Sequence, residues 1–279
     1  MHILRLFARD RAALLGLIII LFAVLLTIIG PFIVPYPDDA FEANIMARLE
    51  PPSWEHWFGT DDFGRDILTR VILGTGNALG VAVGVASAAM FVGVPLGLLA
   101  GYHGGRFGEA VMRVTDVFLA VPSLILAIAL AQLLRAGIGG AILALSLTYW
   151  PHFCRNVYSE TRSAKTATFV EALESMGASS SRIVFMHILP NIASPIIVRV
   201  TVGLGYIIMT AAVLGFLGIG VPPPTPDWGA AIANSRQHLP EAWWLVSFPG
   251  LAIFLAVLGF NLLGDGLRDI IDPRLRRAR

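Results

Sequence analysis

The sequence is poor in charge, cysteine and lysine. Only 14% of its 279 residues are charged, against about a quarter in a typical soluble domain, and 56% are hydrophobic. Cys154 is the only cysteine, which excludes an internal disulfide and leaves no thiol cluster for a metal. Lys165 is the only lysine, and Ala164 precedes it, so the chain lacks the Gly-x-x-x-x-Gly-Lys-Ser/Thr loop that holds nucleotide phosphates. These absences exclude a disulfide-based fold and a P-loop ATPase.

Charged residues are missing altogether from six long stretches. These are Ala12–Pro37, Val71–Gly105, Val117–Leu134, Ala136–Cys154, Val200–Pro226 and Ala242–Gly264. At 1.5 Å per residue each is long enough, or nearly so, to cross a hydrocarbon layer about 30 Å thick. Inside lipid the backbone must satisfy its own hydrogen bonds, so such stretches predict helices. The sequence therefore predicts an all-α polytopic membrane protein with six transmembrane helices.

The basic residues are distributed unevenly between the loops. If the N-terminus lies inside and all six stretches cross, fifteen of the 20 basic residues fall on the inner side, which predicts that both termini are cytoplasmic. The expected organisation is as follows: a cytoplasmic N-terminus (1–11), the first span (12–34), an outer loop (35–75), a core of five further spans (76–265) and a basic cytoplasmic tail (266–279).

The outer loops contain two helix signals. Asp61 or Asp62 is placed to cap a short amphipathic helix that leads into the second span. Its apolar face would consist of Phe63, Ile67 and Val71. In the last outer loop, Asp227 is placed to cap a second short helix from Trp228 onward.

A stretch at about 155–190, on the inner side, has more helical pattern than a simple connector. Thr168 and Glu171 have the spacing of a capping box, and Gly177 supplies a helix stop. Three apolar residues then share one helical face: Phe169, Leu173 and Met176. A second helix is expected from near Arg182 to Pro190, capped by a serine of 179–181. The spacing leaves open whether the apolar face packs on the protein's own helices or binds a partner.

Specific residues of this stretch resemble the EAA loop of permease subunits of binding-protein-dependent ABC importers. The resemblance rests on the triplet Glu171-Ala172-Leu173, on Gly177, and on Ile188-Leu189-Pro190 followed by Asn191. Leu173 and His187 depart from the usual residues at their positions. Further stretches resemble the dipeptide/oligopeptide/nickel branch of that family: Phe58–Asp66, Met112–Asp116, Gly215–Gly220, Pro223–Gly229 and Gly264–Pro273.

The resemblance, which runs from about Arg11 to Arg279, implies a type I ABC importer permease, the second or C-type permease of a pair. It implies that ATPase coupling falls to Glu171, Ala172, Leu173, Gly177, Ile188, Leu189 and Pro190. The implied partners are a second homologous permease, two cytoplasmic ATPase subunits that bind ATP and Mg, an extracytoplasmic substrate-binding protein and the lipid bilayer, with no nucleic acid. The chain itself would bind no cofactor and catalyse no reaction, and it would reside in a bacterial or archaeal inner membrane.

Polar residues within the spans have weaker interpretations. Arg199 lies within reach of the inner interface, so it is more simply a snorkelling side chain than a functional one. Asp116 and Asp265 are expected at span ends, where water solvates them. Glycines of the second and fifth spans are expected to allow close helix packing: Gly76, Gly80, Gly84, Gly93, Gly97, Gly203, Gly205 and Gly215.

Three alternatives to a peptide importer remain. An importer of the same family could carry nickel, opine, glutathione or oligosaccharide. An ion-coupled secondary carrier is disfavoured because the six stretches contain no Asp or Glu. An intramembrane enzyme would need a nucleophile with a base, or a metal cluster, and the scattered histidines provide neither.

Overall fold

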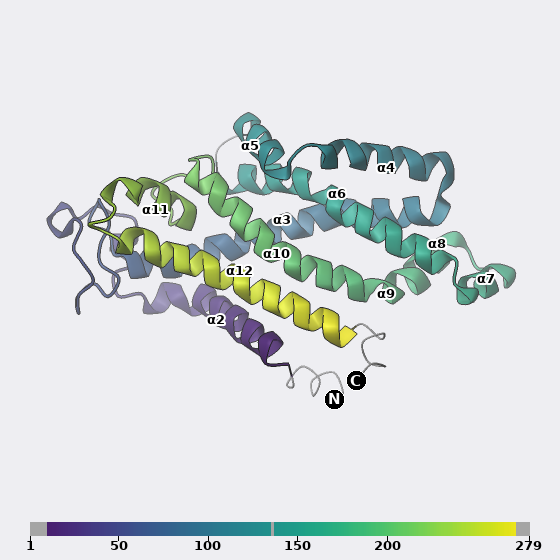
Figure 1. The fold of residues 1–279 in the computed structure, drawn as a ribbon, viewed down its shortest axis with the longest axis horizontal. Coiled ribbons are helices and arrows are strands. Elements are labelled where there is room, and N and C mark those ends of the chain that lie inside the picture. The colour runs from purple at the N-terminus through teal and green to yellow at the C-terminus, as the bar shows by residue number, and fades with distance from the viewer. Residues whose placement is uncertain (1–9, 135–136, 272–279) are drawn as a thin grey trace.

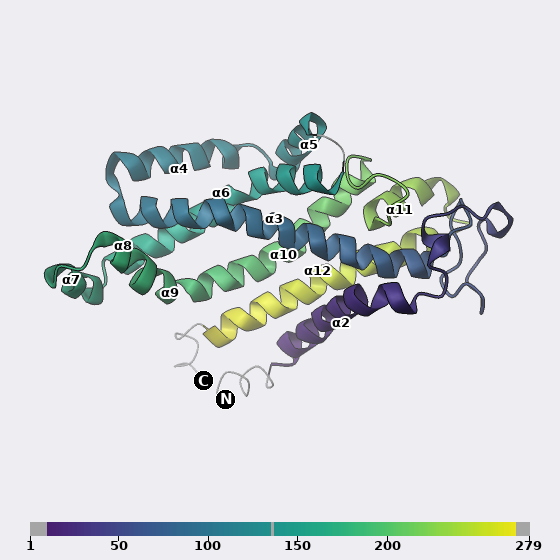
Figure 2. The same cartoon turned by 180° about the vertical axis from the view of Figure 1, so that it is seen from behind.

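The computed structural model describes residues 10–134 and 137–271, and this part of the chain contains helices and loops but no strand. The long helices lie along one axis, with α7 at one end of the molecule and α11 at the other (Figures 1 and 2). The two ends are called the α7 end and the α11 end below. The expected all-α architecture is confirmed.

The long helices are α2 (Arg11–Ile33), α3 (Ile67–His103), α4 (Gly105–Ala120), α5 (Ser123–Leu133), α6 (Ile138–Lys165), α10 (Ala193–Phe216) and α12 (Trp244–Ile271). The short elements are η1 (Asp38–Ala40), η2 (Ile45–Ala47), α7 (Thr168–Ser175), α8 (Ser180–Arg182), η3 (Ile183–Ile188), α9 (Leu189–Asn191), α11 (Trp228–Ser235) and η4 (Arg236–His238).

Four helices, α2, α3, α10 and α12, are long and apolar enough to cross a membrane. The predicted third span, Val117–Leu134, is not one helix: α4 and α5 meet at a 90° bend. Pro122 explains the break, because its ring disfavours helical backbone at Val121, which is extended (φ −87°, ψ 131°). Helix α4 also begins at Gly105, well before the predicted start.

Helix α6 contains most of the predicted fourth span. It has 28 residues and would extend about 42 Å, but it is less apolar than the four spans above. Its position accounts for this, because much of its surface contacts α3, α4, α5 and α10 rather than lipid. The count of six spans stays a prediction.

Glycines bring the backbones of α3 and α6 into contact. A Cβ atom on Gly93 would lie 2.6 Å from the Trp150 carbonyl oxygen, and one on Gly97 would lie 2.6 Å from that of Cys154. Such close approach through small residues is typical of membrane helices. The prediction is confirmed for these two glycines. It is wrong for Gly80, where a Cβ would have nothing within 4 Å.

Helix α2 lies at the edge of the bundle against α12. A Cβ on Gly16 would lie 2.6 Å from the backbone nitrogen of Leu263, so the start of α2 and the last turns of α12 are adjacent. The start of α2 and the end of α12 therefore lie on the same side of the molecule (Figure 1). Residues 1–9, 135–136 and 272–279 lie outside the described residues. They include much of the predicted N-terminal segment and of the basic tail.

The loop before α3 differs from its prediction. Asp66, not Asp61 or Asp62, caps α3, since its Oδ2 accepts a hydrogen bond from the Thr69 amide at 2.8 Å. Asp61 instead accepts from the amides of Phe63 and Arg65 in a turn. No separate amphipathic helix therefore precedes α3 within the described part of this loop.

Candidate functional site

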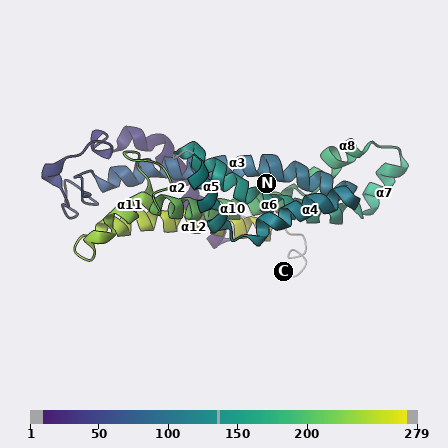
Figure 3. The ribbon, with the colours of Figure 1, turned by 90° about the horizontal axis from the view of Figure 1, so that it is seen from above.

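Helix α7 projects from the end of the bundle, beyond α3 and α6 (Figures 1 and 3). Val170 fixes it, because this side chain is 1% exposed. It belongs to a group of buried residues, the α7-end cluster: Leu98, Tyr102, Val157, Val170, Ile183, Val184, Ile188, Ile192 and Ile196. One face of α7 is thus anchored to the bundle by apolar burial.

The start of α7 differs from the predicted capping box. Ala167 is the N-cap and Thr168 is already the first helical residue, with no side-chain hydrogen bond at the cap. Because the Thr168 backbone is helical, its hydroxyl does not serve the first-turn amides as an N-cap would. Glu171 is exposed, in the first turn, where a negative charge interacts favourably with the helix dipole.

The end of α7 confirms the predicted stop at Gly177. Its φ is +76°, in the left-handed region that favours glycine. The amide of Ala178 donates to the Leu173 carbonyl at 3.0 Å and that of Gly177 to Glu174 at 2.9 Å. These two bonds form a Schellman motif, which satisfies carbonyls that the helix end leaves free.

The predicted second helix runs from Ser180 to Asn191, as α8, η3 and α9 in succession. The segment Ile183–Ile188 is a π-helical turn directly before Leu189-Pro190, and the Leu189 amide bonds to the Val184 carbonyl. Pro190 has no backbone N–H to donate to the preceding turn, which accounts for the irregular backbone hydrogen bonds of this segment. Ser179 occupies the N-cap position but makes no side-chain hydrogen bond.

The residues of the predicted coupling set differ in exposure. Ile188 is fully buried in the α7-end cluster, and Leu173 and Leu189 pack against it. The remaining members are exposed: Glu171, Ala172, Gly177 and Pro190. The predicted apolar face also divides, since Leu173 packs inward while Phe169 and Met176 are 36% and 75% exposed. Packing on the protein's own helices therefore applies to Leu173, while binding of a partner by Phe169 and Met176 stays a prediction.

A polar connection that the sequence did not reveal ties α7 to α3 and α6. The Tyr102 hydroxyl donates to Glu174 Oε1 at 3.0 Å, and Lys165 Nζ donates to the Tyr102 carbonyl at 2.6 Å. The Lys165 ammonium also lies 5.0 Å from the centre of the Tyr102 ring. No local pattern could indicate these contacts, because 72 residues separate Tyr102 from Glu174.

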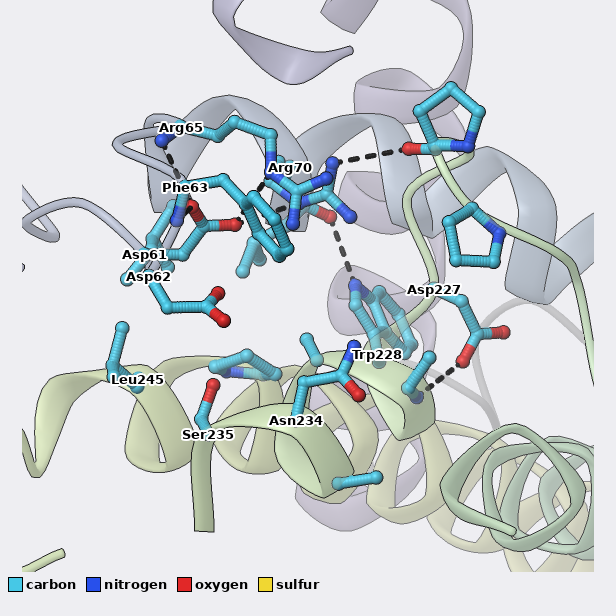
Figure 4. Close-up of a pocket in the computed structure, with 18 of the residues that line it drawn as sticks. Asp61, Asp62, Phe63, Arg65, Arg70, Asp227, Trp228, Asn234, Ser235 and Leu245 are labelled. Atoms are coloured by element: carbon cyan, nitrogen blue, oxygen red, sulfur yellow. Dashed lines mark hydrogen bonds and ion pairs between the residues drawn. The ribbon is translucent and has the colours of Figure 1, made fainter. Parts of the chain in front are cut away.

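A pocket of about 520 Å³ lies at the α11 end, between the loop before α3 and the segment around α11 (Figure 4). Asp61 and Arg65 form an ion pair there, 2.8 Å between Oδ2 and Nε. Arg70 donates to the carbonyl oxygens of Ala40 and Pro224, and so joins the two loops.

Helix α11 forms one wall of this pocket. As predicted, Asp227 caps it, accepting from the Ala230 amide at 2.7 Å. Trp228 Nε1 donates to the Val71 carbonyl at 3.1 Å. Burial raises the pKa of both Asp62 and Asp227 above the usual value of an aspartate. Among the described residues, no three His, Cys, Asp or Glu side chains lie together as a metal site would require.

Two family patterns match the sequence. The one described as "Binding-protein-dependent transport system inner membrane component" matches residues 93–277. The one described as "N-terminal TM domain of oligopeptide transport permease C" matches residues 2–52.

Curated relatives match nearly the whole chain. A dipeptide transport system permease protein of Alkalihalophilus pseudofirmus is 43% identical over 268 residues, covering 96% of this chain and 88% of the relative. A di/tripeptide transport system permease protein of Pseudomonas aeruginosa is 39% identical, covering 98% and 91%. A glutathione transport system permease protein of Pectobacterium atrosepticum is 40% identical, covering 98% and 90%.

The fold is similar to that of a solved transporter chain. A chain of the MetNI methionine ABC transporter, in an inward-facing conformation, superposes with a TM-score of 0.61 at 18% identity. The match covers 73% of this chain and 97% of the other.

Proposed function

The chain belongs to the family of binding-protein-dependent transport system inner membrane components, and from this we propose that it forms part of the membrane path of an ATP-driven importer for short peptides. Relatives that match almost end to end and are named for dipeptides and di/tripeptides support the cargo. Glutathione is itself a tripeptide, so the relative named for it falls in the same chemical class.

Coupling to ATP is assigned to α7 and the segment that follows it. The observation that carries this proposal is a short helix anchored on one face and open on the other, since Val170 is buried while Phe169 and Met176 are exposed. Glu171, Ala172, Leu173 and Gly177 would belong to the surface that contacts an ATPase subunit. Ile188, Leu189 and Pro190 would connect that surface to α10.

The proposed assembly contains a second homologous permease, two ATPase subunits that bind ATP and Mg, and a substrate-binding protein. The α7 end and both termini would face the cytoplasm. The α11 end, with its pocket and Pro-rich loop, would then face outward and receive the binding protein. The positions of the basic residues support this orientation.

The proposal is tested by affinity purification of this chain from its native membrane in mild detergent, followed by mass spectrometry. We expect a second permease and one or two kinds of P-loop ATPase to be recovered with it. Proteoliposomes of this complex, given the binding protein outside and ATP inside, should accumulate a labelled dipeptide.

The outcome separates the alternatives. Recovery of the complex with uptake of glutathione or a nickel chelate, but not of dipeptides, would keep the importer and change its cargo. A chain that purifies alone, under conditions that preserve a known importer, would contradict the proposal and favour an ion-coupled carrier.

A further inference from the structure

Polar side chains follow one face of the bundle, formed by α4, α5, α6 and α10, where a membrane protein would ordinarily present apolar groups to lipid. We call the set the polar strip: Asp116, Ser123, His152, Arg155, Arg199 and Tyr206. Each of them is exposed or half-buried. Figure 1 shows α6 lying between α4 and α10, so that residues from the three helices can meet on one side.

The centre of the strip is a pair of hydroxyl groups. Ser123 Oγ, at the start of α5, and Tyr206 OH, on α10, lie 3.1 Å apart in an exposed contact. The Tyr206 ring is 5.6 Å from that of the buried Tyr149 on α6. The contact therefore brings together residues of three helices, α5, α6 and α10. Tyr206 lies about 20 Å from the start of α10 and about 15 Å from its end, which is close to mid-membrane.

Arg199 lies two turns from Tyr206 on the same face of α10. It is exposed, and it has no ion-pair partner in the part of the chain that the structure describes. His152 of α6, one turn from Tyr149, lies within its electrostatic reach. The arginine is thus part of a polar surface and does not stand alone among apolar side chains.

Arg155 and Asp116 continue the strip on α6 and α4. They form an ion pair between the two helices, with side chains 48% and 57% exposed. Asp116 is eleven residues into α4, about 16 Å from its start, and its expected position at the end of a span stays a prediction. Because the charges of Arg155 and Asp116 cancel, the charge of Arg199 makes the strip positive overall.

The exposed face of α2 shows what contact with lipid looks like in this chain. Beyond Arg11 at its start, its large exposed side chains are apolar, among them Leu21, Phe22 and Ile28.

Tyr206 lies near the depth of Ile19 of α2, because Gly205 meets Phe260 and Gly259 meets Ile19. Exposed polar groups at such a depth ordinarily face a water-filled cavity or another protein. Arg199 lies nearer the inner end of the bundle, level with the start of α2, because Gly264 meets Val202 and Gly266 meets Ala13. The hydroxyl pair therefore faces something other than lipid, and the charged residues of the strip continue this surface toward the inner end of the bundle.

We propose that the polar strip is one wall of a water-filled path, in which Arg199 contacts the carboxylate of a passing solute. This inference rests on the proposed function and adds the residues that line the route. Every free peptide has a terminal carboxylate, for which an unpaired guanidinium is a fitting partner. The hydroxyls of Ser123 and Tyr206 supply further hydrogen bonds to a polar backbone.

Water access is measured by cysteine labelling, for which the chain is well suited because Cys154 is its only cysteine and is buried. In a Cys154→Ala background, Arg199→Cys, Tyr206→Cys and the control Phe22→Cys are each introduced. Phe22 is 59% exposed in the middle of α2. Native membrane vesicles are treated with a charged methanethiosulfonate reagent, and we expect at least tenfold faster labelling at 206 than at 22, which lies at a similar depth. Labelling at 199 shows whether the arginine position is open to water.

Contact with the carboxylate is measured by uptake of a dipeptide and of its C-terminal amide. Arg199→Gln should raise the KM for the free dipeptide about tenfold, leave that for the amide unchanged, and retain ATP hydrolysis. Arg199→Lys, which keeps the positive charge, should bring the KM for the free dipeptide most of the way back to its original value. The binding protein is the same for each variant, so the ratio between variants reports on the membrane path alone.

The outcomes distinguish this inference from the function on which it rests. If the unsubstituted complex takes up dipeptide but position 206 labels no faster than 22, the strip is not a path wall, although the importer stands. If labelling is fast but Arg199→Gln affects both substrates equally, the carboxylate contact is wrong. Absence of ATPase subunits and of uptake in the unsubstituted protein would instead contradict the proposed function.

Discussion

Gly177 terminates α7 with a φ of +76°, and a Cβ atom there would meet nothing within 4 Å. The requirement for glycine is therefore one of backbone conformation, and a side chain placed there would extend into the open surface next to Met176. Asn and Asp both tolerate left-handed backbone better than other residues with a side chain, which makes them a matched pair for testing charge on this surface.

Gly177→Asp should leave the protein in the membrane but lower uptake per ATP hydrolysed several-fold, because it places a charge on the proposed ATPase contact. Gly177→Asn, which has the same shape without the charge, should retain much of the coupling. Both are measured as the ratio of dipeptide uptake to phosphate release in proteoliposomes. Normal coupling in the Asp variant would remove α7 from the ATPase contact.

Gly97→Ala should destabilise the protein by about 1–3 kcal/mol, because the added methyl group would overlap the Cys154 carbonyl oxygen and push α3 from α6. Gly80→Ala on the same helix is the control, since its methyl group would enter open space. The measurement is thermal unfolding in detergent. Equal melting temperatures for both variants would show that the α3–α6 contact is looser than the structure has it.

At the scale of elements, α7 depends on contacts with α3 and α6 as well as on its own sequence. It has eight residues, and isolated helices of that length are unstable in water. Burial of Val170 and the Tyr102–Glu174 hydrogen bond therefore hold it in place. These contacts are also the means by which a movement of α7 would reach α3.

Tyr102→Phe removes the hydrogen bond to Glu174 and should reduce the stability of α7 by about 1 kcal/mol. Hydrogen exchange at residues 168–177 should become several-fold faster, while exchange elsewhere in α3 stays unchanged. Tyr158→Phe is the control, because its hydroxyl accepts only an exposed bond from Arg162. Unchanged exchange in α7 would mean that apolar burial alone holds the helix.

Helix α11 should make stability depend on pH through its cap, Asp227. Burial raises the pKa of this carboxyl, although hydrogen bonds from the Ala230 and Gly229 amides and the charge of Arg70 oppose the effect. A raised pKa means that the folded state holds the proton more tightly than the unfolded state. Asp227 therefore lowers stability as the pH rises from about 3.8 through the raised pKa.

Asp227→Asn keeps an oxygen that can accept from the Ala230 amide and removes the buried charge. Its melting temperature should fall less than that of the unsubstituted protein as the pH rises from 4 to 7. The comparison is made by thermal unfolding in detergent across that range. A parallel pH dependence in both proteins would assign the effect to another group, such as Asp62.

At the scale of the whole molecule, α3 connects the two candidate sites. Its first residues contact the α11 end, where the Val71 carbonyl accepts from Trp228, and its last contact α7 through Tyr102. The helix has 37 residues and is packed against α6 from Gly84 to Gly101. Coupling between the two sites, if they are coupled, would have a continuous helix to run through.

Orientation in the membrane is a prediction at the same scale. Fluorescent protein fused to either terminus should fold and fluoresce, because both termini are expected in the cytoplasm. Alkaline phosphatase inserted in the exposed loop around Ser53 should be active, because that loop is expected outside. Active phosphatase at a terminus would reverse the proposed orientation and place α7 on the wrong side for an ATPase.

The sequence by itself determined the features that depend on a few neighbouring residues. Absence of charge located four helices long and apolar enough to span a membrane, α2, α3, α10 and α12, because lipid excludes unpaired charge from any single segment. The stop at Gly177 and the cap at Asp227 were predictable because turns and caps involve residues within one or two turns of helix. The cap at Asp66 was missed because three nearby aspartates offer the same local signal.

Only the tertiary structure decided which side chains meet from distant segments. Gly97 packs on α6 and Gly80 does not, although both are glycines of one helix, because the crossing of α3 and α6 selects the contact. In the same way, the sequence alone could not link Arg199 to Tyr206 and Ser123, because their proximity depends on how α5, α6 and α10 pack together. Such contacts depend on how the helices pack, and packing is a property of the whole chain that no local pattern carries.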